Sequence, residues 1–368
     1  MRVLIAPDAF AGTLTAPEAA RAIAEGWLRR APLDELTLAP MADGGEGFVD
    51  VLHEALGGEL LVTSAPGPLG VEVPVTVLRV GTTTHVESVQ VCGPGLLDAP
   101  DPWHASSVGV GTAIAVALDG GARHVVVGLG GSASLDGGAG LLHALGATAD
   151  VPLDQGPEGL RGITHLDLEP ARARLGDARL TIAADVTLPL LGMFGAARTS
   201  GADHGLDDSQ VLSLDAVLDS LVVAACGTAP SERRIAEAKG AGAAGGAGFA
   251  LLLLGGIVAS GIGLVADATG FDEQASAHDL VVTGEGTFDH TSRAGKVVFG
   301  VAERAAAAAR PCIVLAGHVT VGSRERRAMG VESAYAIDDL VSPEVAVGDA
   351  HVSLAALAER VARSWSRQ

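Results

Sequence analysis

The chain has 368 residues, of which 48% are hydrophobic and 18% charged, a composition typical of a globular protein rather than a disordered one. The 24 Lys and Arg residues are outnumbered by 44 Asp and Glu, and the formal net charge of −20 disfavours binding to nucleic acid or anionic membranes. Cys92, Cys226 and Cys312 lack C-x-x-C spacing, which disfavours a disulfide framework or zinc knuckle and fits a reducing compartment.

Short apolar runs rich in β-branched residues alternate with Ala-rich stretches along the chain, a pattern that predicts βα units and a parallel sheet. The first unit is a strand over residues 2–6 and a helix that ends near Arg30. Thr15 and Glu18 have the spacing of a capping box, with Pro17 in the first turn, so this helix should begin just after Thr15. Pro and Asp interrupt the first apolar run too early for a secretory signal, so we expect a cytoplasmic protein.

The second unit repeats this plan, with a strand over residues 35–39, a loop over 40–47 and a helix that carries Phe48. Further strands are expected at 71–80, 85–88, 124–128, 179–184, 279–283, 311–316 and 334–337. Further helices are expected at 110–118, 137–145, 212–224, 245–254, 295–309 and 354–365. The uncharged segment 240–266 is long enough to span a bilayer, but its glycines predict loops around a short buried helix instead.

The first and last βα units share one pattern, whereas the middle of the chain has longer loops and less regular spacing. We therefore expect two α/β domains. One is discontinuous and consists of residues 1–63 and 280–368, and the other, residues 64–279, is inserted into it.

The loops that follow the predicted strands are acidic and rich in glycine. In open parallel sheets, ligands bind beyond the carboxyl ends of the strands. Carboxylates at such positions can hold Mg²⁺ or accept a proton from a substrate hydroxyl, and oxygen ligands without paired His or Cys favour Mg²⁺ over zinc or copper. The acidic residues at these positions are Asp8, Asp43, Glu46, Asp185, Glu285 and Asp289.

One of these loops, residues 130–138, is a candidate for binding phosphate. Backbone N–H groups of glycines can approach an anion closely, and a helix N-terminus behind them adds dipole attraction. The loop matches neither a Walker A motif nor a dinucleotide fingerprint. Its candidate residues are Gly130, Gly131, Ser132, Asp136 and Gly137.

Lys296 follows Gly295 at the start of a predicted helix and is one of only two lysines, so it is a candidate phosphate ligand. Each feature also has a purely structural interpretation. Asp43 and Glu46 have the spacing of a helix N-cap and its partner, Asp185 could form a turn, and Lys296 could be a surface lysine.

Taken together and in this order, the loops resemble the motifs of the type 1 glycerate kinase family from residue 2 to about residue 365. The matching segments are Ile5-Ala6-Pro7-Asp8, Pro40–Gly47, Gly130–Ala133, Asp136–Gly140, Asp185-Val186-Thr187, Gly242–Gly246, Thr283–Gly286, Asp289 and Gly295-Lys296. The resemblance implies a Rossmann-like domain interrupted by a second α/β domain, with the active site in the cleft. It implies phosphorylation of glycerate, a small molecule, with ATP and Mg²⁺.

The resemblance also implies roles for individual residues. Asp43, Asp185, Glu285, Asp289 and Lys296 would be catalytic, one of the carboxylates as general base, with Asp43 and Asp185 as metal ligands. Asp8, Glu46, Gly130, Gly131, Ser132, Asp136 and Gly137 would bind substrate or phosphate.

Several positions depart from the family's pattern inside its motifs. Ala11 and His204 stand where the family has lysines, and Thr287 stands where it has an arginine. These are the groups expected to neutralise a transferring phosphoryl group. Ser134-Leu135 replaces Thr-Asn, Leu188 replaces Asn and Thr291 replaces Gln. Two alternatives therefore stay open: a kinase for a different small hydroxy acid, and a non-catalytic pseudokinase that binds a nucleotide or metabolite.

Overall fold

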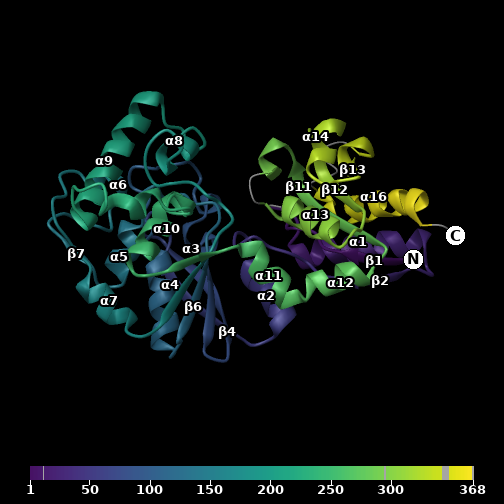
Figure 1. Cartoon of the computed structure of the whole chain (residues 1–368), viewed down its shortest axis with the longest axis horizontal. Coiled ribbons are helices and arrows are strands. Elements are labelled where there is room, and N and C mark those ends of the chain that lie inside the picture. Colours follow the sequence, from purple (N-terminus) through teal and green to yellow (C-terminus); the bar gives the residue numbers. More distant parts are fainter. Residues whose placement is uncertain (11, 294–295, 342–347, 367–368) are drawn as a thin grey trace. The chain divides into compact units, whose positions relative to one another are not determined.

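The computed structural model describes residues 1–10, 12–293, 296–341 and 348–366, so Ala11 and Gly295 lie outside the described residues. The chain divides into two compact units (Figure 1). The first unit comprises Met1–Asp43, Asp50–Leu56 and Ile262–Gln368, and therefore contains both chain ends. The second unit comprises Gly44–Val49 and Gly57–Gly261.

A five-stranded parallel sheet forms the centre of the first unit, in the order β13-β12-β11-β1-β2. In β1, Val3 pairs with Leu280 of β11 on one side and with Leu36 of β2 on the other. The first and last βα units of the sequence therefore share one sheet. The strands are β1 (Arg2–Ile5), β2 (Glu35–Leu38), β11 (Leu280–Phe288), β12 (Cys312–Val319) and β13 (Ser333–Ala336).

Both faces of this sheet are covered, as expected for parallel strands. Val3 and Ile5 belong to a core with buried residues of α1 (Ala16–Arg30) and α16 (Ala350–Trp365), whereas Leu4 alternates to the other face and is also fully buried. Gly26 lets α1 and α16 approach closely, since a Cβ there would lie 1.9 Å from the carbonyl oxygen of Ala355. The other helices of this unit are α2 (Phe48–Leu56), α11 (Gly261–Thr269), α12 (Phe271–Ala277), α13 (Val297–Ala307) and α14 (Ser323–Ala328).

The predicted capping box at the start of α1 is confirmed. The Glu18 N–H donates to the Thr15 hydroxyl at 3.3 Å, and the Glu18 carboxylate accepts from the Thr15 N–H at 2.9 Å. These two bonds satisfy N–H groups that have no partner within the helix.

The second unit holds a six-stranded mixed sheet in the order β10-β9-β6-β5-β4-β3. The strands from β10 to β5 are parallel, while β3, β4 and β5 form an antiparallel meander that the sequence did not predict. The strands are β3 (Glu59–Pro66), β4 (Glu72–Val80), β5 (Thr83–Glu87), β6 (His124–Gly128), β9 (Arg179–Ala183) and β10 (Ile257–Ala259). A short hairpin of β7 (Thr148–Ala149) and β8 (Leu166–Asp167) completes the strands described in this unit.

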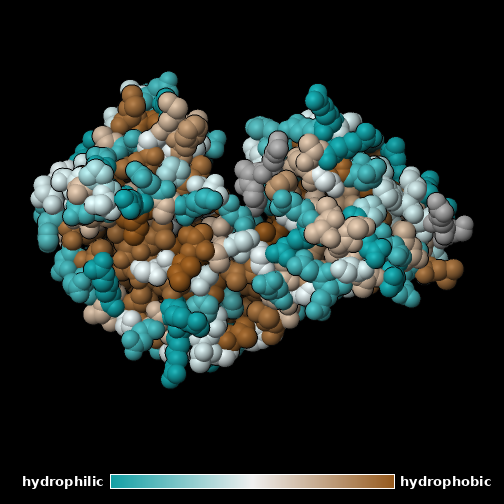
Figure 2. Space-filling model, viewed as in Figure 1, coloured by the Kyte–Doolittle hydropathy of each residue, from teal (hydrophilic) through white to brown (hydrophobic). Residues whose placement is uncertain are grey.

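Helices rich in Ala, Gly, Val and Leu pack around this second sheet. Figure 2 shows a hydrophobic area over α4, α5 and α10 on the face in view. The helices are α3 (Val89–Cys92), α4 (Val108–Asp119), α5 (Ala139–Ala144), α6 (Gly156–Gly159), α7 (Glu169–Leu175), α8 (Ala196–Ser200), α9 (Asp208–Cys226) and α10 (Ala243–Leu253). α10 lies in the uncharged segment and is broken by left-handed residues at 244–246, so its regular part is the short buried helix predicted there.

Helix α9 is long and apolar enough to cross a membrane by length and composition, which is a weak indication on its own. Its apolar face, with Leu214, Leu218 and Leu221, is buried in the core of the second unit. Its N-terminus is closed by a capping box at Asp207 and Gln210. These contacts are those of a core helix.

The unit boundaries fall at different residues from the expected domain boundaries, 63/64 and 279/280. β3 pairs with β4 along its whole length and therefore belongs to the second sheet. At the other boundary, Ile262 of α11 packs against Gly300 of α13, and α12 contacts β1. The division consequently lies at 56/57 and 261/262.

Candidate active site

Five ionisable side chains gather in the first unit, beyond the carboxyl ends of β1 and β2 and along or after the last part of β11. We call Asp8, Asp43, Glu285, Asp289 and Lys296 the acidic cluster. Asp8 follows β1, Asp43 follows β2, and Glu285 lies within the long β11. Asp43, Glu285 and Lys296 all act electrostatically on Asp8, and Asp43, Asp289 and Lys296 act on Glu285. The structure thus brings together four of the predicted acidic residues and the predicted lysine.

Glu285 is the buried member of the cluster. Its side chain is only 5% exposed, and its Oε1 has no hydrogen-bond partner among the described residues. Burial raises the pKa of Glu285 from 4.5 to about 7, with smaller rises from the charges of Asp289 and Asp43. A hydrogen bond from Ser292 and the charge of Lys296 act in the opposite direction. This carboxyl can therefore exchange a proton near neutral pH.

Asp8 is half-buried, and its loop is held tightly to the sheet. The Asp8 N–H donates to the Gly284 carbonyl at 2.8 Å, and its carboxylate accepts from the Ala9 N–H at 2.8 Å. Burial, and then repulsion from Asp43, raise the pKa of Asp8 well above 3.8. Asp8 and Glu285 are thus the two members of the acidic cluster whose pKa values are raised, in each case mainly by burial.

A short hydrogen-bonded chain links Asp289 to Lys296 through Thr291. The Asp289 carboxylate accepts from the Thr291 N–H at 2.7 Å and from its hydroxyl at 2.6 Å, and these bonds lower the pKa of Asp289. Lys296 Nζ in turn donates to the Thr291 hydroxyl at 3.2 Å. Lys296 is also the N-cap residue of α13, so its charge lies beside the positive end of that helix. Sequence reasoning treated Thr291 only as a departure and missed this bridge.

The loop after Asp43 belongs to the second unit and is shaped by close backbone packing. Gly44 has φ +100°, and a Cβ there would lie 2.3 Å from the Ala183 carbonyl oxygen at the end of β9. The buried Glu87 carboxylate accepts from the Gly47 and Val49 N–H groups at 3.1 and 3.0 Å. Glu87 therefore satisfies N–H groups at the start of α2. Because Glu87 lies about forty residues further along the chain, this contact was not predicted.

The interpretation of Asp43 and Glu46 as a helix N-cap and its partner does not agree with the bounds of α2. α2 begins at Phe48, five residues after Asp43, and the Glu46 side chain is exposed. Glu46 belongs to the second unit with Asp185, which is half-exposed and directly follows β9 and Ala184. The acidic cluster, which is defined within the first unit, therefore accounts for four of the six acidic residues that the sequence singled out.

The predicted phosphate-binding loop follows β6 in the second unit, and only its first part is accessible. Gly131 is exposed, while Gly130 and Ser132 are half-buried. The Gly130 N–H makes only a long contact of 3.4 Å to the Ser88 hydroxyl, and in this fully described unit the Gly131 N–H has no protein acceptor. The accessible N–H groups of this part can bind an anion.

The second part of the loop is structural. Asp136 is completely buried, and its carboxylate accepts from the Ser107 N–H and hydroxyl at 2.8 Å and from the N–H groups of Gly138 and Gly140 at 2.9 and 3.1 Å. The Gly137 N–H is bonded to the Gly245 carbonyl at 3.0 Å. Asp136 and Gly137 therefore hold the loop in place and are not free to contact a substrate, in contrast to their expected role.

No three His, Cys, Asp or Glu side chains in the described part of the chain are arranged to hold a metal ion by themselves. Carboxylate oxygens of the acidic cluster, including the orphaned Oε1 of Glu285, are nonetheless hard ligands of the kind Mg²⁺ prefers. Mg²⁺ is usually held by one or two carboxylates together with phosphate oxygens and water. The residues present therefore fit a Mg²⁺ ion that arrives with a phosphate ligand.

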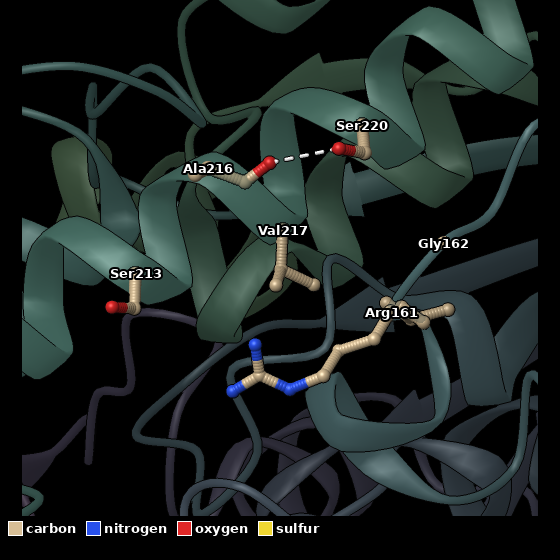
Figure 3. Close-up of a pocket in the computed structure, with 7 residues that line it drawn as sticks. Arg161, Gly162, Ser213, Ala216, Val217 and Ser220 are labelled. Carbon is tan, nitrogen blue, oxygen red and sulfur yellow. Dashed lines mark hydrogen bonds between the residues drawn. The ribbon is translucent and has the colours of Figure 1, made fainter.

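A separate pocket of about 340 Å³ lies in the second unit between α9 and the turn at residues 160–162 (Figure 3). It contains none of the predicted site residues. The Arg161 guanidinium stacks 4.7 Å from the centre of the Trp103 ring, and its Nε donates to Glu158 at 2.7 Å. On the opposite wall, the Ser220 hydroxyl donates to the Ala216 carbonyl at 3.0 Å. The remaining lining residues are Leu160, Gly162, Ser213 and Val217.

Comparison with known proteins covers nearly the whole chain. The model of the glycerate kinase family matches residues 3–366. A glycerate 2-kinase of Escherichia coli is 35% identical over 357 residues, which cover 95% of this chain and 92% of the relative. An uncharacterised protein of Mycobacterium tuberculosis is 40% identical over 369 residues, which cover 98% of this chain and 91% of the relative. A crystal structure of a Salmonella typhimurium protein named glycerate kinase 2 superposes on this chain with a TM-score of 0.78. The two sequences are 33% identical, and the match covers 99% of this chain and 98% of the other.

Proposed function

The chain belongs to the glycerate kinase family, and from this premise we propose that it transfers a phosphoryl group from ATP to a hydroxyl of glycerate. Glycerate is the small-molecule substrate, ATP the phosphoryl donor and Mg²⁺ the metal. The protein acts in the cytoplasm, which agrees with its unpaired cysteines.

The convergence of the acidic cluster at one end of the parallel sheet is the observation that carries this proposal. Ligands of open α/β sheets bind at the carboxyl ends of the strands. Asp8 and Asp43 follow β1 and β2, and Glu285 lies in the part of β11 that extends beyond its pairing with β1. A purely structural role would not require two carboxyl groups, Asp8 and Glu285, whose pKa values are raised by burial and by the charge of Asp43, together with a buried Glu285 oxygen that has no partner among the described residues. Such an arrangement stores unfavourable electrostatic energy that a substrate or cation can relieve.

Glu285 is the general base of the proposed reaction. Its carboxyl group is buried, has an oxygen free to accept a hydrogen bond, and titrates at about 7. A base with a pKa near the working pH removes the proton of an attacking hydroxyl most effectively. Asp8 binds the substrate beside it, while Asp289 and Thr291 orient Lys296.

Lys296 and the N-terminus of α13 bind oxygens of the transferring phosphoryl group. The ammonium group and the helix end both provide positive potential, and phosphoryl transfer depends mainly on positioning and charge stabilisation. In the second unit, Gly130, Gly131 and Ser132 bind phosphate through backbone N–H groups.

Asp43 and Asp185 are the proposed carboxylate ligands for Mg²⁺, each directly after or close to the end of a parallel strand. When bound, Mg²⁺ neutralises negative charge on the phosphates of ATP. The carboxylates of this chain bind and orient the ion, and they need the nucleotide because no complete protein cage is found among the described residues.

A coupled assay of ADP release with glycerate and Mg-ATP tests the proposal. We expect turnover with glycerate, and a rise in melting temperature when millimolar Mg-ATP is added, because a ligand that binds only the native state stabilises it. Turnover with another small hydroxy acid but not with glycerate would indicate a kinase of different specificity. A thermal shift without ADP release for any acid tested would indicate a pseudokinase, and the absence of both would refute nucleotide binding.

A further inference from the structure

Glu87 is a buried carboxylate of the second unit that lies outside the acidic cluster. It is the last residue of β5, and it is only 4% exposed. Its two oxygens accept from the Gly47 and Val49 N–H groups at 3.1 and 3.0 Å. These N–H groups lie at the start of α2, where a helix supplies no acceptors of its own and where negative charge is favourable. Glu87 therefore binds residues 44–49, which we call the strip, to the end of β5.

The strip also lies across the ends of two further strands of the second sheet. A Cβ on Gly128, the last residue of β6, would lie 2.5 Å from the Gly44 carbonyl oxygen and 2.7 Å from Phe48 Cδ1. At the end of β9, the Ala183 carbonyl oxygen would lie 2.3 Å from a Cβ on Gly44. Backbone packed this closely leaves the strip no room to move toward the sheet.

The strip contacts the phosphate-binding loop directly. A Cβ on Gly130 would lie 2.6 Å from the Gly45 Cα, so the two backbones approach closely. Ser88 follows Glu87, and its N–H donates to the Gly128 carbonyl at 3.0 Å. The Ser88 hydroxyl makes the long contact of 3.4 Å with the Gly130 N–H. Two consecutive residues at the end of β5 therefore hold the two sides of this contact, Glu87 the strip and Ser88 the start of the loop.

Few side chains of the strip itself can hold it in place. Three of its six residues are glycines, and Glu46 is exposed. Only Phe48 and Val49 bury a side chain, and both lie at the end of the strip that is remote from the loop contact. Asp43, the proposed metal ligand, directly precedes the strip. The bonds from Glu87 consequently bear on the backbone that connects Asp43 to the contact with the loop.

We propose that Glu87 is a positioning residue for nucleotide binding, which holds the strip in place and thereby fixes the accessible N–H groups of residues 130–132 and the backbone beside Asp43. This inference rests on the proposed function, because it takes Mg-ATP as the ligand of the loop. If Glu87 only capped α2, its loss would lower stability and leave the loop unchanged.

The first test needs no ligand and compares amide hydrogen exchange in the parent, Glu87→Gln and Asp207→Ala. The glutamine amide keeps the size of the side chain but turns an N–H donor toward one of the two N–H groups. Asp207→Ala is the matched control, because it removes another carboxylate of the second unit that accepts two N–H bonds at the start of a helix, α9.

We expect several-fold faster exchange in residues 44–49 and 128–133 of Glu87→Gln, and parent-like exchange there in Asp207→Ala. Faster exchange confined to the strip, or no change in either segment, would overturn the proposal. If Glu87→Gln does not fold, Phe48→Leu takes its place with the same expected results, since it loosens the strip at its contact with Gly128.

The second test measures Mg-ATP affinity by calorimetry at a temperature where all three proteins are folded. We expect the dissociation constant to rise about tenfold in Glu87→Gln, as for the loss of a residue that orients a ligand, and to keep the parent value in Asp207→Ala. Equal affinity in the parent and Glu87→Gln would overturn the proposal. If the exchange results are as expected but the parent does not bind Mg-ATP, the hold of Glu87 on the loop is supported and the nucleotide function of the loop fails instead.

Discussion

Replacing Glu285 by glutamine should make the protein more stable at alkaline pH while it removes the proposed base. The amide is close in size to the carboxyl and can still accept a hydrogen bond from Ser292, but it carries no charge. The substitution therefore removes the unfavourable ionisation of a buried group without opening a cavity. General acid–base catalysis contributes roughly a factor of 10²–10⁴, so turnover should fall by at least about a hundredfold.

The size of the stability gain follows from the pKa of Glu285, which is raised from 4.5 to about 7 in the native state. Between these two values the native state binds more protons than the unfolded state, so the free energy of unfolding decreases as the pH rises from 4.5 to about 7. At about 1.4 kcal/mol per pH unit, the loss above pH 7 amounts to about 3 kcal/mol. Glu285→Gln should abolish this loss, and the two proteins should have similar stability near pH 4.5.

Urea unfolding followed by tryptophan fluorescence can isolate the first unit. Trp27 and Trp365 belong to this unit, whereas Trp103 lies in the second unit and would be replaced by phenylalanine in both proteins. The midpoint for Glu285→Gln should exceed that of the parent at pH 8 and coincide with it near pH 4.5. The reasoning would be refuted if the difference between the two proteins did not change with pH, or if the glutamine variant were less stable at pH 8.

Four further substitutions test the site and the loop that follows β6. Lys296→Ala should lower turnover at least tenfold, about 1.4 kcal/mol in activation free energy. It should also raise the pKa of Glu285 in the pH–rate profile, because the charge of Lys296 lowers that pKa. Lys239→Ala, which removes the other lysine, is the control and should change neither turnover nor this pKa. Asp136→Asn should destabilise the second unit by about 1–3 kcal/mol, because the NH₂ group of the amide would face the buried N–H donors of Ser107 and Gly138. An unfolding curve, followed by Trp103 fluorescence, that is unchanged by the substitution would contradict this. Asp43→Asn and Asp185→Asn should each reduce the rise in melting temperature caused by Mg-ATP. If a variant retains the full rise, the residue that it replaces is not a metal ligand.

Local signals in the sequence were sufficient for most of the fold. The first helix begins at Ala16 because a capping box and a proline act within four residues, and these signals do not depend on the rest of the chain. β3 was missed because it is a largely exposed edge strand whose residues alternate only weakly between buried and exposed positions. β11 extends to Phe288, beyond the predicted end at 283, because pairing with β12 outweighs the low strand propensity of Gly284 and Gly286.

The candidate site was predictable in residue type but not in grouping. Strand ends identified Asp8, Asp43 and Glu285, since parallel strands place their carboxyl ends at one edge. Asp136 was interpreted as a ligand because its buried donors come from residues around Ser107, some thirty positions away. Neither this contact nor the bridge made by Thr291 has a periodicity or spacing that a sequence can reveal.

The position of β1 in the middle of its sheet has a consequence for synthesis on the ribosome. β1 ends at Ile5, whereas its partner β11 begins at Leu280, 275 residues later. At roughly 5–20 residues per second, β1 waits about 14–55 s for that partner. The second unit ends at Gly261, so all of its strands are available before the first unit can close.

During that interval the first βα segment can pair only with β2. The part of the apolar face of α1 that packs against α16, including Ile23 and Trp27, cannot be covered until α16 has been synthesised. The nascent chain therefore presents a hydrophobic N-terminal segment for most of its synthesis, and over the last third of it the second unit can already be folded. Such a segment is a natural site for chaperone binding and for aggregation when translation stalls.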